Sequence, residues 1–302
     1  MRVLVTGANG YLGRAVIEAL AAAGHDPIAM VRRATSSLQV PTRVADLLDE
    51  VGLRQALDGV EAVCHLAGLT RARESTVDPL PYFRANTAGT IALLDAMAAT
   101  GVARIVFAST GSIYGTPEHQ PMTEELPDAP PHPYAASKLA AEFAINAQAQ
   151  AGHLSAVVLR LLNVAGGIDP DATRLIPRVL AAAKNRSALE INGDGSTIRD
   201  YLHIIDAAAA FVASVDRMPP LGKATRFNIG SGHGTSILDV VTAVERVTGH
   251  RVHLVHRPQV SEPAALISDS SNAIAEFDWR PIHSDIESIV RDTWHGHTLR
   301  GS

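Results

Sequence analysis

A glycine-rich run between a predicted strand and a predicted helix constrains this chain most. The run VTGANGYLG joins an apolar segment at residues 2–6 to a helical pattern at residues 11–24. Its glycines, Gly7, Gly10 and Gly13, follow a G-x-x-G-x-x-G spacing. Residues without a side chain let backbone N–H groups and a helix N-terminus approach a pyrophosphate. A strand, this turn and a helix in succession therefore predict a dinucleotide-binding unit.

Short apolar runs continue to alternate with helical patterns along the first half of the chain. The runs expected to form strands are residues 2–6, 27–31, 61–67, 104–109 and 156–163. Because their apolar residues do not alternate with polar ones, both faces of each strand are expected to be buried. The pattern predicts an α/β protein with a Rossmann-type doubly wound parallel sheet and helices on both faces.

The alternation breaks after about Asn163, which predicts a division of the chain. We expect residues 1–165 to form the dinucleotide-binding domain and residues 166–302 to form mainly a smaller α/β substrate-binding lobe. One more strand–helix unit, near residues 225–249, is expected to return to the sheet of the first domain.

The residues after the second expected strand bear on cofactor choice. NAD sites usually place an acidic residue there for the ribose 2′-hydroxyl. Here Val31 cannot accept a hydrogen bond, and Arg32 and Arg33 follow it. Arginine suits a 2′-phosphate, so these residues favour NADP, although two solvated loop arginines remain the alternative. Asp46, with its neighbour Leu47 in the run VADLLD, ends a further expected strand between those at 27–31 and 61–67 and is a candidate contact for the adenine amine.

Tyr134 and Lys138 lie four residues apart at the start of an alanine-rich helical pattern. Positions i and i+4 share one helix face, so both side chains are expected to point into one site. A lysine ammonium beside a phenol lowers the phenol pKa from about 10. The phenol would then serve as a proton-transfer group near neutral pH. The alternative is a pair of amphipathic side chains on a surface helix.

The chain resembles the extended short-chain dehydrogenase/reductase family, in the NAD-dependent epimerase/dehydratase group that acts on nucleotide sugars. The resemblance covers nearly the whole chain and rests on the order and spacing of the segments TGANGYLG, HLAGLTRARES, NTAGT, FASTGSIYG, PYAASK, RLLN, GDGSTIRDYLHIIDAA and FNIGSG. Within the family, the chain is most similar to 4-epimerases of the UDP-glucose/UDP-galactose type.

The resemblance implies site residues of three kinds. The catalytic set is Thr110, Tyr134 and Lys138: the tyrosine takes the proton of the sugar C4 hydroxyl as hydride leaves C4, the threonine shares that hydrogen bond, and the lysine holds the nicotinamide ribose. The cofactor-binding residues are Gly7, Asn9, Gly10, Tyr11, Leu12, Gly13, Arg32, Arg33, Asp46, Leu47, Leu66, Ala67, Gly68, Asn86, Tyr134 and Lys138. The substrate-binding residues are Thr110, Tyr134, Asn163, Leu175, Asn192, Arg199 and Arg257.

The phosphate-binding roles follow the same resemblance. Asn163 would touch the nucleotide diphosphate, and the forked donors of Arg199 would pair with a phosphate. Arg257 would do the same, although the segment RPQVSEPA is longer than the Arg-Pro-Gly-Asp of the family.

The implied activity is that of a nucleotide-sugar 4-epimerase working through a 4-keto intermediate. The arginine pair favours an alternative, an NADPH-dependent nucleotide-sugar 4-ketoreductase with the same catalytic set. A 4,6-dehydratase needs Asp-Glu directly after the threonine, and Gly111 and Ser112 stand there instead. A non-catalytic NADP-binding regulator would need none of the three catalytic residues. The family favours NAD and the arginines favour NADP, so both cofactors stay open here.

Composition excludes several other classes. The chain of 302 residues has a formal net charge of −5 and no tail of like charges, so no nucleic-acid partner is expected. It has no apolar run of about 18 residues and no signal peptide, and its lone Cys64 is expected to be a buried, reduced thiol, which predicts a cytoplasmic protein without a membrane span. His253 and His256 would face opposite sides of a strand, so no metal site is expected. The expected partners are a nucleotide diphosphate sugar and a second copy of the chain in a homodimer.

Overall fold

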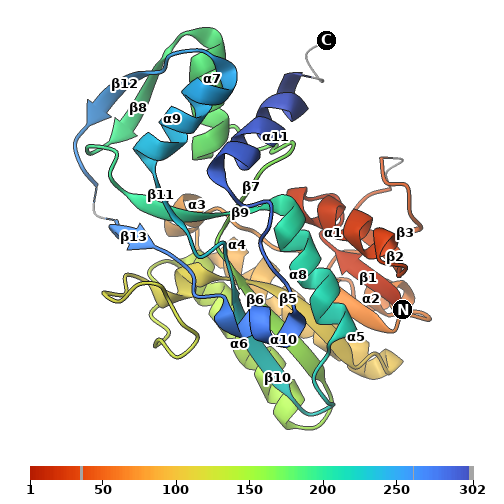
Figure 1. Ribbon diagram of the computed structural model, residues 1–302. Helices are drawn as coiled ribbons and strands as arrows, with labels where there is room; N and C mark the ends of the chain where they lie inside the picture. Colours follow the sequence, from red (N-terminus) through yellow and green to blue (C-terminus); the bar gives the residue numbers. More distant parts are fainter. Residues whose placement is uncertain (35–36, 261, 299–302) are drawn as a thin grey trace.

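A central parallel sheet organises the molecule (Figure 1). The structure, a computed structural model, describes residues 1–34, 37–260 and 262–298. Seven strands run in the order β10-β6-β5-β4-β1-β2-β3, and every neighbouring pair is parallel. Their bounds are β1 Arg2–Thr6, β2 Asp26–Val31, β3 Thr42–Val44, β4 Ala62–His65, β5 Arg104–Thr110, β6 Ser155–Leu161 and β10 Ala224–Ile229. The predicted Rossmann-type doubly wound sheet is confirmed.

Helices cover both faces of the sheet because its strands are apolar on both. Along β5, Val106 packs in the cluster of buried side chains on one face, whereas Ile105 and Phe107 pack in the cluster on the other. The first face is covered by α1 (Tyr11–Ala22), α8 (Ile204–Asp216) and α10 (Ser271–Phe277), and the second by α2 (Glu50–Ala56), α5 (Gly89–Thr100) and α6 (Pro133–Gln150).

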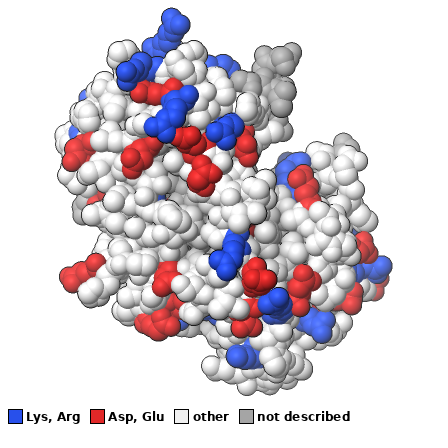
Figure 2. All heavy atoms as spheres, viewed as in Figure 1, with Lys and Arg blue, Asp and Glu red and all other residues white. Residues whose placement is uncertain are grey.

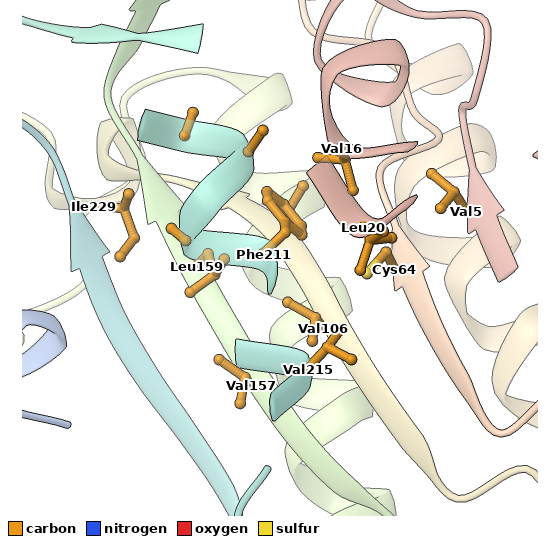
Figure 3. Close-up of a cluster of buried hydrophobic side chains, with 14 of the residues drawn as sticks. Val5, Val16, Leu20, Cys64, Val106, Val157, Leu159, Phe211, Val215 and Ile229 are labelled. Carbon is orange, nitrogen blue, oxygen red and sulfur yellow. The ribbon is translucent and has the colours of Figure 1, made fainter. Parts of the chain in front are cut away.

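The first cluster accounts for the lone cysteine. Figure 3 shows Cys64 among the apolar side chains of the sheet and of α1 and α8, with Leu20 and Val106. It is fully buried, and burial raises the pKa of its thiol. Cys64 is therefore part of the hydrophobic core.

The strand order creates a crevice where ligands bind in folds of this kind. After β1 the chain adds β2 and β3 on one side and then crosses to β4 on the other side of β1. Open α/β sheets bind their ligands at such a switch point, outside the carboxyl ends of the strands. Here those ends are Thr6 of β1 and His65 of β4, which lie beside each other in register.

A smaller lobe stands beyond these strand ends, at the top of Figure 1. Its third buried cluster is formed by α7 (Leu175–Asn185), α9 (Ile237–Thr248) and α11 (Ile286–Thr298), with the parallel pair β8 (Ala188–Asn192) and β12 (His253–Arg257). A further small sheet is centred on β9 (Ile198–His203), which pairs with β7 (Asn163–Ala165), β11 (Gly234–Ser236) and β13 (Ala265–Leu266).

The predicted boundary at residue 165 stays a prediction. The structure interleaves the two parts: β10, α8 and α10 come after residue 165 and lie in the layers of the central sheet. The helix that follows β10, α9, packs in the small lobe. Residues 299–302 of the predicted lobe lie outside the described ranges. Among the described helices, none has the length and apolarity of a membrane span.

Candidate active site

One large cavity lies between the carboxyl ends of the sheet strands and the small lobe. Its volume is about 1530 Å³, whereas pockets for a single small ligand usually hold about 300–1,000 Å³. It therefore has room for more than one small ligand. On the face shown in Figure 2, basic and acidic side chains are interspersed, and no continuous basic patch is seen.

Most of the predicted site residues line this cavity. Those on its wall are Gly7, Asn9, Gly10, Tyr11, Leu12, Gly13, Arg32, Arg33, Asp46, Leu47, Leu66, Ala67, Gly68, Thr110, Tyr134, Lys138, Asn163, Leu175 and Arg199. Asn86, Asn192 and Arg257 are not on it. The structure thus brings together residues spread over most of the chain.

The glycine-rich turn is packed too tightly for side chains. Gly7 has φ +69°, and a Cβ there would lie 2.8 Å from the backbone nitrogen of Ala67. A Cβ on Gly13 would lie 2.2 Å from the carbonyl oxygen of Gly7. These contacts hold the turn against β4 and the start of α1.

The N-terminus of α1 opens into the cavity without a protein cap. Gly10 is the N-cap residue, so no side chain accepts from the first-turn N–H groups, and the first turn carries no acidic residue. Uncapped N–H groups at a helix start form an anion-binding site. This end of the cavity therefore fits the pyrophosphate of a dinucleotide.

A buried hydrogen-bond chain fixes the strand ends beneath the turn. The Thr6 hydroxyl oxygen accepts from the backbone N–H groups of Leu66 and Ala67, both at 3.1 Å. The hydroxyl itself lies 2.7 Å from His65 Nδ1. On the other side of the ring, His65 Nε2 lies 3.0 Å from the hydroxyl of Thr90, which donates to the Asn86 carbonyl.

The directions of these bonds define the state of the imidazole. Because Thr90 donates its only hydroxyl proton elsewhere, it accepts from His65, which places the ring proton on Nε2. Nδ1 then accepts from Thr6. Burial lowers the pKa of His65 to about 3, so the ring stays neutral. The sequence analysis missed this support of the segment Leu66–Gly68.

Asn86 acts from behind the cavity wall. Its side-chain oxygen accepts from Leu69 N at 2.8 Å, and its nitrogen donates to the Leu69 carbonyl at 3.0 Å and to Ser137 Oγ at 2.9 Å. It is fully buried. Asn86 thus bridges the 68–69 loop to α6, and its predicted role at the cofactor end of the site stays a prediction.

Tyr134 and Lys138 lie on one face of α6, as predicted, and meet the end of β5. Lys138 Nζ donates to the Ala108 carbonyl at 2.9 Å. Tyr134 interacts with the side chain of Thr110, the last residue of β5. One turn further on, Glu142 accepts a short hydrogen bond from the Ser109 hydroxyl. Three turns of α6 are thereby attached to the last three residues of β5.

The electrostatics of Tyr134 differ from the sequence-based explanation. Burial is the largest influence and raises the pKa of Tyr134, while Thr110 and the guanidinium of Arg174 act in the opposite direction. Lys138 is itself buried, which lowers its pKa to about 8. The expected lowering of the phenol pKa by the lysine was wrong, because desolvation dominates. The phenol is protonated in the free protein.

A buried ion pair behind the catalytic face was missed by the sequence analysis. Arg160 is fully buried, and its Nε and Nη2 donate to the two carboxylate oxygens of Glu142 at 3.0 and 2.7 Å. Its Nη1 lies 2.7 Å from Asp128. The available signal was spacing, since Glu142 follows Tyr134 by two steps of four and shares its helix face.

At the small-lobe end of the cavity, Arg199 and Asn163 already have protein partners. Arg199 Nη2 lies 2.8 Å from the Glu262 carboxylate, and Nη1 donates to the carbonyls of Ile198 and Pro263 at 2.7 and 2.9 Å. Beside it, Asn163 donates to the Asp200 carbonyl at 3.3 Å.

Two predicted substrate residues lie on the outer edge of the small lobe. Arg257 pairs with Glu190, and the two side chains are 54% and 56% exposed. Asn192 is the register partner of Arg257 in the β8–β12 pair. The structure does not bring either residue to the cavity, because that strand pair projects away from it.

Arg174 was also missed, since no motif marks it. It lies 3.2 Å from the buried carboxylate of Asp169 and over the ring of Tyr11 at 5.5 Å, and it lines the cavity. Tyr11 donates a short hydrogen bond to the Gly166 carbonyl. The side chain of Arg174 therefore joins the glycine-rich turn to the small lobe, close enough to Tyr134 to influence its pKa.

The fold and this site define a dinucleotide-binding α/β enzyme with a tyrosine–lysine pair at its centre. The model of the NAD dependent epimerase/dehydratase family matches residues 3–230. The chain is 36% identical to UDP-glucose 4-epimerase of Streptomyces lividans, over 98% of this chain and 96% of that protein, and 37% identical to that of Corynebacterium glutamicum, over 97% and 95%. It belongs to the NAD-dependent epimerase/dehydratase family.

Solved structures give the same result. A UDP-glucose 4-epimerase of Stenotrophomonas maltophila, solved with NAD and formylated UDP-arabinopyranose, has a TM-score of 0.93 and 29% identity, with 100% of both chains covered. That of Brucella ovis, solved with NAD, has a TM-score of 0.92 and 32% identity over 98% of each chain.

Proposed function

We propose that this chain is a nucleotide-sugar 4-epimerase that interconverts UDP-glucose and UDP-galactose through a 4-keto sugar. The observation that carries the proposal is one continuous cavity with the open N-terminus of α1 on its wall, Arg199 on its small-lobe side, and Thr110 and Tyr134 among its lining residues. The curated relatives quoted above share the activity in their names and match nearly the whole chain.

Tyr134, Thr110 and Lys138 each have a separate role in the proposed reaction. A bound nicotinamide dinucleotide supplies the acceptor and donor of hydride at the sugar carbon. Once its phenol has lost its own proton in the complex, Tyr134 would take the C4 hydroxyl proton and return it, acting as base and then as acid. Thr110 fixes the hydroxyl through a second hydrogen bond. Lys138, attached to β5, holds the ribose next to the reacting carbon.

The cofactor is a nicotinamide dinucleotide held by the glycine-rich turn. The support is the tightly packed turn at Gly7 and Gly13 beside the uncapped start of α1, and solved relatives carry NAD in their structures. The nucleotide diphosphate of the substrate would lie at the small-lobe end, beside Asn163 and Arg199.

A 4-ketoreductase is the second candidate, favoured by Arg32 and Arg33 on the cavity wall. Such an enzyme would consume a reduced dinucleotide with each turnover, whereas an epimerase would not. A non-catalytic regulator is less well supported, because it has no need of the arrangement of Thr110, Tyr134 and Lys138.

We also infer that the chain forms a homodimer. Helices α5 and α6 lie together on one face of the sheet, yet Ile91 of α5 and Phe143 of α6 are 43% and 61% exposed. Exposed apolar side chains on adjacent helices are typical of an interface. Sedimentation of the wild type and of Phe143→Glu tests this, with a monomeric variant expected. The cytoplasmic location stays a prediction.

The decisive experiment is interconversion followed by proton NMR. Purified protein is incubated with UDP-galactose, and separately with UDP-glucose, in the presence of NAD or NADP. We expect both reactions to reach the same equilibrium mixture without net consumption of the dinucleotide. If neither sugar is converted with either dinucleotide, the proposal fails. If either sugar is instead oxidised to a 4-keto sugar with stoichiometric reduction of NADP to NADPH, the reductase running in reverse replaces the epimerase.

A further inference from the structure

The end of β2 lacks the acceptor that an adenosine ribose with a free 2′-hydroxyl requires. Val31, the last residue of β2, is 5% exposed and lines the cavity. Among the described residues on the cavity wall, the only carboxylates are Asp46 and Asp169. Asp46 accepts from Leu48 N at 2.9 Å at the end of β3, and Asp169 is paired with Arg174.

Two unpaired arginines stand at this place. Arg32 and Arg33 directly follow Val31, are exposed, and line the same cavity. Within the described ranges neither side chain has an ion pair or a hydrogen bond, whereas Arg174 and Arg199 on the same wall each have a carboxylate partner.

The strand register sets the arginines beside the glycine-rich turn. Thr6, the last residue of β1, is the register partner of Met30 in β2, so residues 31–33 lie next to the start of the turn. The turn is also braced from α1 by Arg14, which is not on the cavity wall. Arg14 Nη2 donates to Asn9 Oδ1 at 2.7 Å and to Ser37 Oγ at 2.9 Å. Arg32 and Arg33 therefore supply two guanidinium groups at this edge of the cavity, and Arg14 holds Asn9 of the turn from behind.

We propose that this edge binds the 2′-phosphate of NADP, so that the chain prefers NADP(H) to NAD(H), in contrast to its NAD-containing relatives. This rests on the proposed function only in that a dinucleotide occupies the cavity. A phosphomonoester carries about −1.5 to −2 charges at neutral pH and accepts charge-assisted, bidentate bonds from arginine. NAD offers only a hydroxyl here, next to a strand end whose last residue, Val31, has no side-chain acceptor, and it leaves both arginines without an anion.

Calorimetric binding of NADP, NAD and the fragment adenosine 2′,5′-bisphosphate tests the proposal without relying on turnover. We expect the wild type to bind NADP at least about tenfold more tightly than NAD. The double variant Arg32→Ala/Arg33→Ala should bind both dinucleotides equally, with its NAD affinity unchanged. Both replaced side chains are exposed, so the variant should fold.

The matched control removes the same charge elsewhere. Arg54→Ala/Arg251→Ala alters two exposed arginines outside the cavity wall and should keep the wild-type preference. Equal wild-type affinities for NAD and NADP, or equal losses for both in the Arg32/Arg33 variant, would overturn the proposal. Titration of UDP into the same protein separates the two claims: failure to bind UDP counts against the epimerase, and a missing NADP preference counts only against this inference.

Discussion

The two ends of the cavity are made of different chemical groups. The dinucleotide end is formed mainly by the backbone: glycines in close contact, the uncapped first turn of α1, and strand ends fixed by the bonds of Thr6 and His65. The substrate end is formed by charged side chains, and Arg199 is held by Glu262. The first end is shaped for its ligand in advance, whereas the second would have to exchange an internal ion pair for the substrate phosphate if Arg199 binds it as proposed.

The largest effect is expected between the two ends, at Tyr134. Tyr134→Phe should reduce turnover by about 10²–10⁴-fold, because it removes proton transfer, and should leave dinucleotide and UDP binding nearly unchanged. Steady-state kinetics and calorimetry measure both. The control is Tyr114→Phe, which removes a buried hydroxyl bonded to Asn228 away from the cavity and should retain activity. Turnover within a few-fold of wild type would remove Tyr134 as the acid–base group.

One added methyl group at Gly13 should disrupt dinucleotide binding. Gly13→Ala would place a Cβ 2.2 Å from the Gly7 carbonyl oxygen, and the turn must shift to relieve the clash. We expect a loss of stability of about 1–3 kcal/mol and a large loss of dinucleotide affinity, with UDP binding retained. Gly24→Ala is the control: its φ is +83° but no atom lies within 4 Å, so it tests backbone strain without a clash. Unchanged dinucleotide affinity in Gly13→Ala would contradict a preformed cradle.

UDP binding should depend on Arg199 and not on Arg257. Arg199→Ala is expected to weaken UDP binding by about 2–5 kcal/mol, because a charge-assisted partner of the diphosphate is lost, and to leave dinucleotide affinity unchanged. Arg257→Ala removes an exposed arginine paired with Glu190 outside the cavity and should have no effect on UDP. The opposite ranking in a UDP titration would show that the small lobe rearranges on binding.

The attachment of α6 to β5 should make stability depend on pH. The pKa of Lys138 is lowered by burial from 10.5 in the unfolded chain to about 8. Between these values the unfolded state binds more protons, so this residue makes stability rise with pH from about 8 to 10.5, by about 3 kcal/mol in total. Lys138→Met should therefore stabilise the protein relative to wild type more at pH 7 than at pH 10. Urea unfolding of both proteins at pH 7 and pH 10 measures the difference in the free energy of unfolding. An equal gain from Lys138→Met at both pH values would show that Lys138 does not titrate between them in the folded protein.

The smallest effect is expected at Glu262, which pairs with Arg199 and would compete with the substrate phosphate for it. Glu262→Gln keeps the shape but removes the charge paired with Arg199 at a partly exposed site, so UDP should bind more tightly by about 0.2–1 kcal/mol. The control Glu190→Gln removes the exposed partner of Arg257 and should not alter UDP affinity. Weaker UDP binding in Glu262→Gln would mean that Glu262 holds Arg199 in its binding position.

The same contrast explains what could be predicted from the sequence. The glycine spacing, the apolar strands and the i,i+4 pair of Tyr134 and Lys138 are local patterns, and the structure places these residues as predicted. The partners of Asn86, Leu69 and Ser137, could not be predicted because they come together only through packing.

The substrate end was harder to predict because it depends on contacts distant in sequence. No spacing rule links Arg199 to Glu262, or shows that β8 and β12 carry Asn192 and Arg257 away from the cavity. The pKa of Tyr134 was misjudged for a related reason, since burial outweighs the neighbouring charge and burial depends on the complete fold.

The most direct test of the central claim uses UDP-galactose that carries deuterium at C4. If Tyr134 and its neighbours support reversible oxidation at this carbon, the same hydride returns to it, and the UDP-glucose formed should retain deuterium at C4 with no net change in the dinucleotide. Proton NMR and mass spectrometry of the product measure the label. UDP-glucose without deuterium at C4, or no conversion of the labelled sugar, would contradict the account.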